Sequence, residues 1–253
     1  MAGSTDIRVD APRRVRCKDD ERDYILSFLR MVFPHTPGSA DQIMFSYSGI
    51  RLLPRSDQDF TGRISRGHSI KRINGPVPQF CMVGGKWTTF RAFAEQVADK
   101  VLGELSKDRL TDTQDMAIGG GKGFRVNEVV AEGRQAHLQA NYGSRADEVW
   151  HYCAALVGDA PLLPDNCYST GEIGFLAEHE HALTLSDIVL RRTSLAITGQ
   201  ISADLIDAIA AVMAKTKGWS EVQQNSQREA LCAELAEFHG VSAEMLQSRN
   251  TKG

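Results

Sequence analysis

The chain has 253 residues, 42% of them hydrophobic and 24% charged, with a formal net charge of −3. This composition is typical of a soluble globular protein that can bury a sizeable core, in one large domain or two ordinary ones. The slightly negative charge and the lack of a polybasic tract exclude a nucleic-acid-binding protein.

The first predicted element is an amphipathic helix in the segment KDDERDYILSFLRMVFP, residues 18–34. Its apolar residues recur at helical spacing, acids occupy the first turn, and Pro34 ends it. Three β-rich runs follow at about 43–53, 64–73 and 79–83, separated by turn-forming stretches, and they predict an antiparallel sheet. Apolar residues from Phe90 to Leu105 then predict a helix of about four turns.

From about residue 125 onward the pattern predicts only helices, which Gly or Ser residues separate. We therefore predict an α+β fold, with a partial antiparallel sheet and helices followed by an all-α C-terminal domain. The predicted domains are residues 1–107, a glycine-rich linker at 108–124, and a helical domain at 125–253. Three strands need a partner layer that the sequence before Lys18 does not supply, so we expect the C-terminal piece of a larger protein.

The cysteines and the N-terminus bear on whether the protein is cytoplasmic, secreted or membrane-bound. The five cysteines are widely spaced without a CxxC motif, which favours neither a disulfide framework nor a zinc knuckle. The first ten residues lack the apolar region of a signal peptide, and no apolar run approaches the ~18 residues of a membrane helix. These features predict a cytoplasmic protein with no anchor of its own.

Two glycines, Gly84 and Gly85, stand between a predicted strand and a predicted helix, followed by Lys86. Glycine lets a ligand lie against the backbone, and amides at a helix N-terminus favour an anion or an electron-rich carbonyl. The alternative is a tight turn where the helix packs on the strand.

Two arginines are candidate anion ligands. Arg51 follows a glycine in a predicted strand, where a buried guanidinium would require a bidentate anion such as carboxylate or phosphate. It could instead reach water or pair with Asp57 or Asp59. Arg66, in ISRGHSI, is either a second phosphate ligand or an exposed charge at the sheet edge.

Three further features favour a structural interpretation. The stretch AIGGGKG lacks the spacing of a phosphate-binding loop and is interpreted as a linker. His179 and His181 lie two residues apart on different helix faces, so they are interpreted as solvated rather than metal-binding. Arg191 and Arg192 end an apolar helical segment, where they are interpreted as an interdomain ion pair or as charges that favour the helix C-terminus.

Seven stretches, taken in chain order, resemble those of one family. They are GSTD (3–6), FP (33–34), YSGIRLL (47–53), SRGH (65–68), GGKWTTFR (84–91), NYGSRADEV (141–149) and TLSDIVLRRTSLA (184–196). The family is that of the FAD-dependent glycerol-3-phosphate dehydrogenases and their glycerophosphate oxidase relatives, within the DAO-type flavoprotein superfamily. The family usually has Pro where Leu52 stands and Leu-Thr-Thr-Tyr where Trp87 to Phe90 stand. The Trp87 difference leaves the substrate or acceptor preference open.

The resemblance implies roles for the candidate residues. Gly49, Gly84 and Gly85 would let the flavin ring approach, and the amides of Lys86, Trp87 and Thr88 would face it. It implies that Arg51 and Arg66 bind the substrate phosphate, and that Lys86 is catalytic, between flavin and substrate. Because the family's GxGxxG dinucleotide fold and proposed histidine base are not found in these residues, the piece alone would be inactive and bind FAD weakly or not at all.

The implied reaction is the oxidation of sn-glycerol 3-phosphate to dihydroxyacetone phosphate, with electrons passing from FAD to a quinone. The resemblance also implies work at the cytoplasmic face of the membrane, compatible with peripheral attachment and a homodimer, and it implies no metal. Two alternatives stay open: an oxidase that uses oxygen, and a non-catalytic helical interaction module. The helical domain has no assigned chemistry.

Overall fold

A computed structural model describes residues 1–35, 38–51, 53, 56, 61–84, 86–119, 121, 133–164 and 166–250. The chain forms two compact units. We call them the helical unit (Met1–Ala2, Val15–Gly49 and Gly119–Gly253) and the hairpin unit (Gly3–Arg14 and Ile50–Ile118). Residues 15–49 thus group with the later helices, and the domain boundaries at 107 and 125 stay a prediction.

The helical unit begins with α1 (Asp19–Val32), which agrees with the predicted first helix. The Glu21 carboxylate accepts a hydrogen bond from the Lys18 backbone N–H, and the acids of the first turn suit the positive helix end. Arg30 donates to the Gly38 carbonyl, which closes the turn after the helix. A short 3₁₀ helix, η1 (Ala40–Gln42), follows.

The rest of the helical unit consists of short helices around one core. The elements are α3 (Arg134–Tyr142), η5 (Gly143–Arg145), α4 (Ala146–Ala155), α5 (Thr170–His179), α6 (Leu185–Asp187), the π-helix η6 (Ile188–Arg192), α7 (Ala203–Lys217), α8 (Glu221–His239) and α9 (Ala243–Ser248). Ser169, Ser202, Ser220 and Ser242 cap four of these helices by accepting a backbone N–H.

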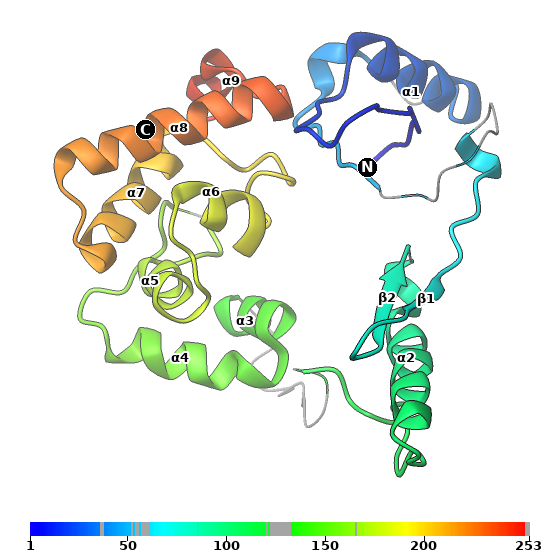
Figure 1. Cartoon of the computed structure of the whole chain (residues 1–253). Coiled ribbons are helices and arrows are strands. Elements are labelled where there is room, and N and C mark those ends of the chain that lie inside the picture. Colours follow the sequence, from blue (N-terminus) through cyan, green and yellow to red (C-terminus); the bar gives the residue numbers. More distant parts are fainter. Residues whose placement is uncertain are drawn as a thin grey trace. The chain divides into compact units, whose positions relative to one another are not determined.

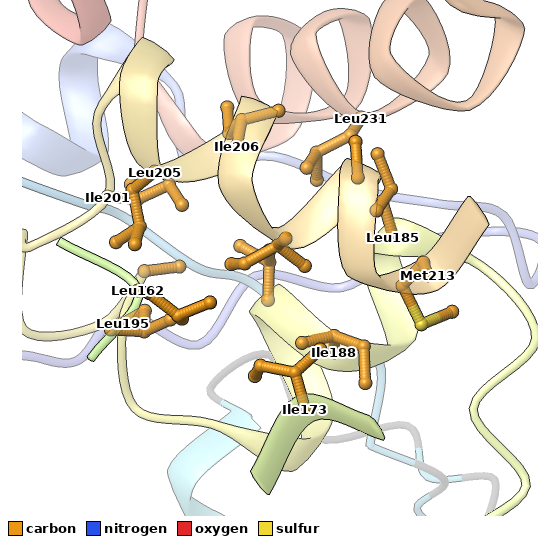
Figure 2. Close-up of a cluster of buried hydrophobic side chains, with 14 of the residues drawn as sticks. Leu162, Ile173, Leu185, Ile188, Leu195, Ile201, Leu205, Ile206, Met213 and Leu231 are labelled. Carbon is orange, nitrogen blue, oxygen red and sulfur yellow. The ribbon is translucent and has the colours of Figure 1, made fainter. Parts of the chain in front are cut away.

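Helix α7 runs through the middle of the core and packs against α5 and α8 (Figure 1). Ile173, Ile188, Leu205 and Met213 are fully buried in this core, which Figure 2 shows. A second, smaller cluster lies around Val149 and joins α3, α4 and α5. Burial of these side chains supplies the main driving force for the unit.

The hairpin unit contains a two-stranded sheet beside one helix (Figure 1). Its elements are η2 (Thr61–Arg63), β1 (Ser69–Ile73), β2 (Gln79–Val83), the 3₁₀ helix η3 (Trp87–Thr89) and α2 (Phe90–Glu104). Strands β1 and β2 are antiparallel, and Ser69 pairs with Val83 while Ile73 pairs with Gln79. Phe93 of α2 is buried, and Arg72 of β1 binds the Glu104 carboxylate.

The fold confirms the coarse α+β prediction of helices with a small antiparallel sheet. The predicted strand at 43–53 was wrong, because the described part of that segment contains no strand. The second predicted strand is shorter than expected and begins at Ser69. The helical hydrogen bonding ends at Arg192 and Thr193 is extended, which agrees with the prediction that Arg191 and Arg192 end this segment. Within the described residues, no helix is long and apolar enough to cross a membrane.

Candidate functional site

The open end of the β-hairpin brings two of the family-like stretches together. The ladder ends at the pair Ser69 and Val83, so SRGH approaches this pair along one strand and GGKW leaves it along the other. Gly84 has a φ of +71°, and a Cβ built on it would lie 3.2 Å from the Gly67 carbonyl oxygen. Arg66 and Lys86 therefore belong to the same end of the hairpin.

This geometry gives Gly84 a structural reason of its own. A left-handed φ disfavours any side chain, and the Gly67 carbonyl would make a tight contact with an added Cβ. The backbone conformation thus explains this glycine without a ligand. Gly85, the second predicted glycine, lies outside the described residues.

Arg66 is partly exposed and forms an ion pair with Asp6 of the GSTD stretch, with a distance of 3.3 Å between Arg66 Nη2 and Asp6 Oδ2. The Thr61 hydroxyl donates to the Asp6 carbonyl oxygen at 3.1 Å, which fixes the Asp6 backbone. A third family-like stretch is thereby joined to the hairpin end. Asp6 was not predicted, because its separation of 60 residues from Arg66 leaves no local pattern.

His68 attaches the SRGH stretch to helix α2. Its ring stacks on Phe93 with a distance of 4.2 Å between ring centroids, and Nε2 lies 3.0 Å from the Gln96 side-chain oxygen. Because that oxygen can only accept, Nε2 carries the proton. Two adjacent turns of α2 thus hold the loop that carries Arg66.

The helix after the glycines starts as a 3₁₀ turn. Lys86 precedes it in an extended conformation, and its carbonyl oxygen accepts from the Thr89 N–H and hydroxyl at 3.0 and 3.1 Å. The amides of Trp87 and Thr88, as the first of the helix, have no partner within it. The Trp87 side chain is 93% exposed, and Lys86 is exposed as well. Lys86, Trp87 and Thr88 are thus all exposed at the start of the helix.

A strap formed by residues 109–116 closes over α2. Glu95 accepts hydrogen bonds from the hydroxyl and the N–H of Thr113, and its carboxylate also pairs with Arg109. Arg91 donates to the Thr113 carbonyl oxygen at 2.6 Å. The bonds from Thr113, together with Arg109, hold the pKa of Glu95 below its ordinary value. Part of the stretch predicted as a linker is therefore attached to the helix.

The remaining predicted site residues are not brought to the hairpin by any described contact. Arg51 is exposed, and no hydrogen bond or ion pair of its side chain is found in the described part of the chain. Its two alternative partners, Asp57 and Asp59, lie outside the described residues. Gly49 belongs to the helical unit, and a Cβ added to it would have no atom within 4 Å.

A buried polar network in the helical unit was not predicted. Glu172 of α5 is fully buried, and its carboxylate accepts from His137 Nε2 at 3.0 Å and from the Tyr142 hydroxyl at 2.7 Å. Nearby, Arg134 pairs with Asp159 at 2.8 Å. Burial and the adjacent Glu172 carboxylate raise the pKa of Tyr142 well above its ordinary value. The partners lie 30 to 35 residues apart, so no sequence spacing reveals them.

The two histidines of EHEHA are both exposed, which agrees with the prediction of a solvated surface. His179 is the last residue of α5, and its ring packs on Phe175 with centroids 4.7 Å apart. His181 follows the helix with a φ of 52°, so the two do not share one helical face. Arg192 donates to the Glu180 carbonyl oxygen at 3.0 Å, and Arg191 pairs with Asp187. These contacts close the loop after α5.

Comparison with known proteins identifies the family. The model of the C-terminal domain of alpha-glycerophosphate oxidase matches residues 80–224, more than half of the chain. The chain belongs to this family. The match begins in β2, includes Gly84, Lys86 and η3, and continues into α8. It confirms the resemblance that the seven stretches indicated.

Curated relatives extend the similarity beyond that range. A glycerol-3-phosphate dehydrogenase from Synechocystis is 29% identical over 246 residues, which cover 90% of this chain and 44% of the relative. An aerobic glycerol-3-phosphate dehydrogenase from Bacillus subtilis is 26% identical and is covered over 45% of its length. The mitochondrial glycerol-3-phosphate dehydrogenase of Rattus norvegicus is 26% identical and is covered over 33%. The chain thus spans less than half the length of these relatives.

Proposed function

We propose that this chain is a C-terminal part of an FAD-dependent glycerol-3-phosphate dehydrogenase and supplies part of its substrate and flavin sites. The observation that carries the proposal is the meeting of SRGH and GGKW at one end of the hairpin, where Gly67 contacts Gly84. The family match and the names of the relatives support the same assignment.

The exposed groups at the hairpin end suit a flavin ring. The first amides of η3 and the Lys86 ammonium form an electropositive set, which favours an electron-rich ring edge and a charge that develops there. FAD, when bound, would accept a hydride from the substrate. In this proposal Lys86, Trp87 and Thr88 contact the cofactor, together with Gly49, Gly84 and Gly85.

The cations suit a phosphorylated substrate. Arg51 and Arg66 would bind the phosphate of sn-glycerol 3-phosphate, and Lys86 would lie between phosphate and flavin. Binding energy from a phosphate that does not react can orient the C2–H bond for transfer. Arg66 already has Asp6 as a partner, so substrate binding would require it to share or exchange that ion pair.

The oxidation removes a hydride from C2 and a proton from the C2 hydroxyl, and gives dihydroxyacetone phosphate. In this proposal the base that takes the proton and the dinucleotide-binding fold belong to the remainder of the protein, so the chain alone would not turn over. A quinone as final acceptor, peripheral association with the cytoplasmic membrane face and a homodimer follow from the resemblance alone.

The matching family model favours one other candidate, an oxidase that passes the electrons to oxygen, because it is described as part of alpha-glycerophosphate oxidase. In that case the substrate and the candidate residues would be the same. The two candidates differ only in the product of the acceptor, which is hydrogen peroxide for the oxidase.

A fusion protein tests the proposal. This chain would be joined to the part of the Synechocystis relative that lies outside the 246 matched residues. We expect bound FAD and reduction of a dye acceptor that depends on glycerol 3-phosphate, whereas the chain alone should show neither. Peroxide formation without the dye would favour the oxidase. A folded fusion protein that binds FAD but does not oxidise glycerol 3-phosphate would contradict both candidates.

A further inference from the structure

Within the helical unit, the segment that precedes Arg51 is bound to the junction of α8 and α9. The Ser46 N–H donates to the His239 carbonyl oxygen at 3.0 Å, and His239 Nδ1 lies 2.8 Å from the Ser46 carbonyl oxygen. Because a carbonyl oxygen can only accept, Nδ1 carries the proton and donates. Ser46 and His239 therefore exchange two hydrogen bonds across 193 positions of the chain.

The same junction holds the two residues before Ser46. The Phe45 ring stacks on the His239 ring with centroids 4.5 Å apart and planes within 10° of parallel. The Arg249 guanidinium donates to the Met44 carbonyl oxygen at 2.8 Å and to the Ile201 carbonyl oxygen at 3.4 Å. We call these contacts of residues 44–46 with His239 and Arg249 the clasp; Figure 1 shows the α8–α9 junction in orange and red.

The residues around the clasp leave room for Met44 and bury part of the clasp. Gly199 has a φ of +73°, and an added side chain there would collide with Met44. Phe45 packs against the main hydrophobic core. Burial lowers the pKa of Arg249, whose head group is thus partly removed from water as it binds the Met44 carbonyl. A segment without regular secondary structure is therefore held by contacts at each of its three residues.

The clasp lies directly before two predicted site residues. Gly49 is three residues after Ser46, and Arg51 is five residues after it. A chain of five residues spans at most roughly 17 Å, so an anchor at Ser46 restricts where Arg51 can go. An unanchored loop would have to lose this freedom when the substrate binds.

We propose that His239 is a positioning residue that orders residues 44–51 from the helical unit, and thereby orients Arg51 for the phosphate. The ordering of residues 44–46 stands on the contacts above. The effect on substrate rests on the proposed function of Arg51.

Three variants separate the hydrogen bond that His239 donates to Ser46 from the stacking of its ring on Phe45. His239→Phe keeps an aromatic ring that can stack on Phe45 and removes the Nδ1 donor to Ser46, together with Nε2, which is buried and has no hydrogen-bond partner in the described part of the chain. His239→Asn keeps an N–H donor near the position of Nδ1 and removes the ring. The control is His179→Phe, which changes another histidine at a helix end that packs on a phenylalanine and has no contact with residues 44–46 among the described contacts.

Amide hydrogen exchange in the 253-residue chain is the first measurement. For His239→Phe we expect exchange at residues 44–51 to become about fivefold faster or more, which corresponds to the loss of one ordinary hydrogen bond. His239→Asn should restore part of the protection, and His179→Phe should leave it unchanged. Unchanged exchange in His239→Phe would overturn the inference.

The Michaelis constant of the fusion protein for glycerol 3-phosphate is the second measurement. His239→Phe should raise it by a similar factor, with kcat less affected and the unfolding midpoint of the helical unit retained. Faster exchange with an unchanged Michaelis constant would overturn the link to Arg51. If the wild-type fusion protein has no activity, the proposed function fails, and the exchange data alone decide whether the clasp orders the segment.

Discussion

The Gly67 carbonyl oxygen lies against Gly84, so close that a Cβ on Gly84 would stand 3.2 Å from it. This contact joins two stretches that the ladder between Ser69 and Val83 has already brought side by side. The hairpin end is therefore built from backbone that disfavours a side chain at this position. Arg66 and Lys86 extend from the two strands that meet there.

Replacement of Gly84 by Ala should destabilise the hairpin unit. The positive φ and the Gly67 carbonyl both oppose a side chain, and we expect a loss of about 1–3 kcal/mol in the free energy of unfolding. Gly103→Ala is the matched control, because Gly103 lies inside α2 with nothing within 4 Å of an added Cβ. Alanine should stabilise that helix by about 0.5–1 kcal/mol. Equal effects of both substitutions in urea unfolding would contradict this interpretation of Gly84.

The attachment of the strap to α2 should weaken at acid pH, when Glu95 becomes protonated. The bonds from Thr113 and Arg109 lower the pKa of this carboxyl in the folded protein below its ordinary value of 4.5. The stabilisation that the Glu95 carboxylate gives to the folded protein is therefore complete above about pH 4.5. It is lost as the pH falls through the lower pKa that this carboxyl has in the folded protein. Protection from hydrogen exchange at residues 109–116, relative to the intrinsic rate at each pH, should fall over this range in wild type. In Glu95→Gln this protection should be weaker already at neutral pH and should change less with acid.

Two tyrosines should lose their phenol protons only at unusually high pH. Burial, with Glu178 nearby, raises the pKa of Tyr152 from 10.0 to about 12, and burial with Glu172 raises that of Tyr142 further. Because the folded protein favours the neutral phenols, the stability that they contribute is complete below about pH 10 and is lost as the pH rises through the folded pKa values. The phenolate absorbance of Tyr152 is obtained by subtracting the titration curve of Tyr152→Phe from that of the wild type. We therefore expect this difference absorbance to appear with a midpoint near pH 12. A midpoint near pH 10 in the folded protein would contradict the buried environment.

The pair of His137 and Glu172 should be a main contributor to the stability of the helical unit. Glu172 is fully buried, so its carboxylate depends on His137 and Tyr142 for its hydrogen bonds. Removing one partner of a buried pair costs about 3–5 kcal/mol, and we expect a loss in this range for Glu172→Ala. The control His151→Ala changes an exposed histidine of α4 and should cost less than about 0.5 kcal/mol. Urea unfolding monitored by circular dichroism measures both.

The elements with strong local patterns were predictable from the sequence. The acids before Tyr24 and the apolar spacing up to Val32 specified α1, and the alternation around Phe80 specified β2. The strand predicted at 43–53 failed because β-rich composition does not supply a partner. In the structure residues 44–46 bind His239 and Arg249 instead. Tertiary contacts of this kind override local propensity.

The candidate site was predictable only in part. The resemblance located Arg66 and Lys86 in stretches that the hairpin brings to one end. Asp6, Glu172 and His239 were missed, since their partners lie tens to hundreds of residues away and single polar residues carry no periodic signal. Contacts between residues so far apart in the sequence form only when the whole unit packs. The roles of Arg51 and the flavin-facing amides stay predictions.

The effect of Arg51→Ala on the kcat/KM of the fusion protein for glycerol 3-phosphate tests the central claim most directly. Within the described residues this substitution breaks no hydrogen bond or ion pair. We expect kcat/KM to fall by about 10- to 100-fold, as for the loss of a charge-assisted hydrogen bond to phosphate. Lys71→Ala, which removes an exposed cation of β1, should leave it within about twofold. If Arg51→Ala and Lys71→Ala have the same small effect, the assignment of this chain to the phosphate site is contradicted.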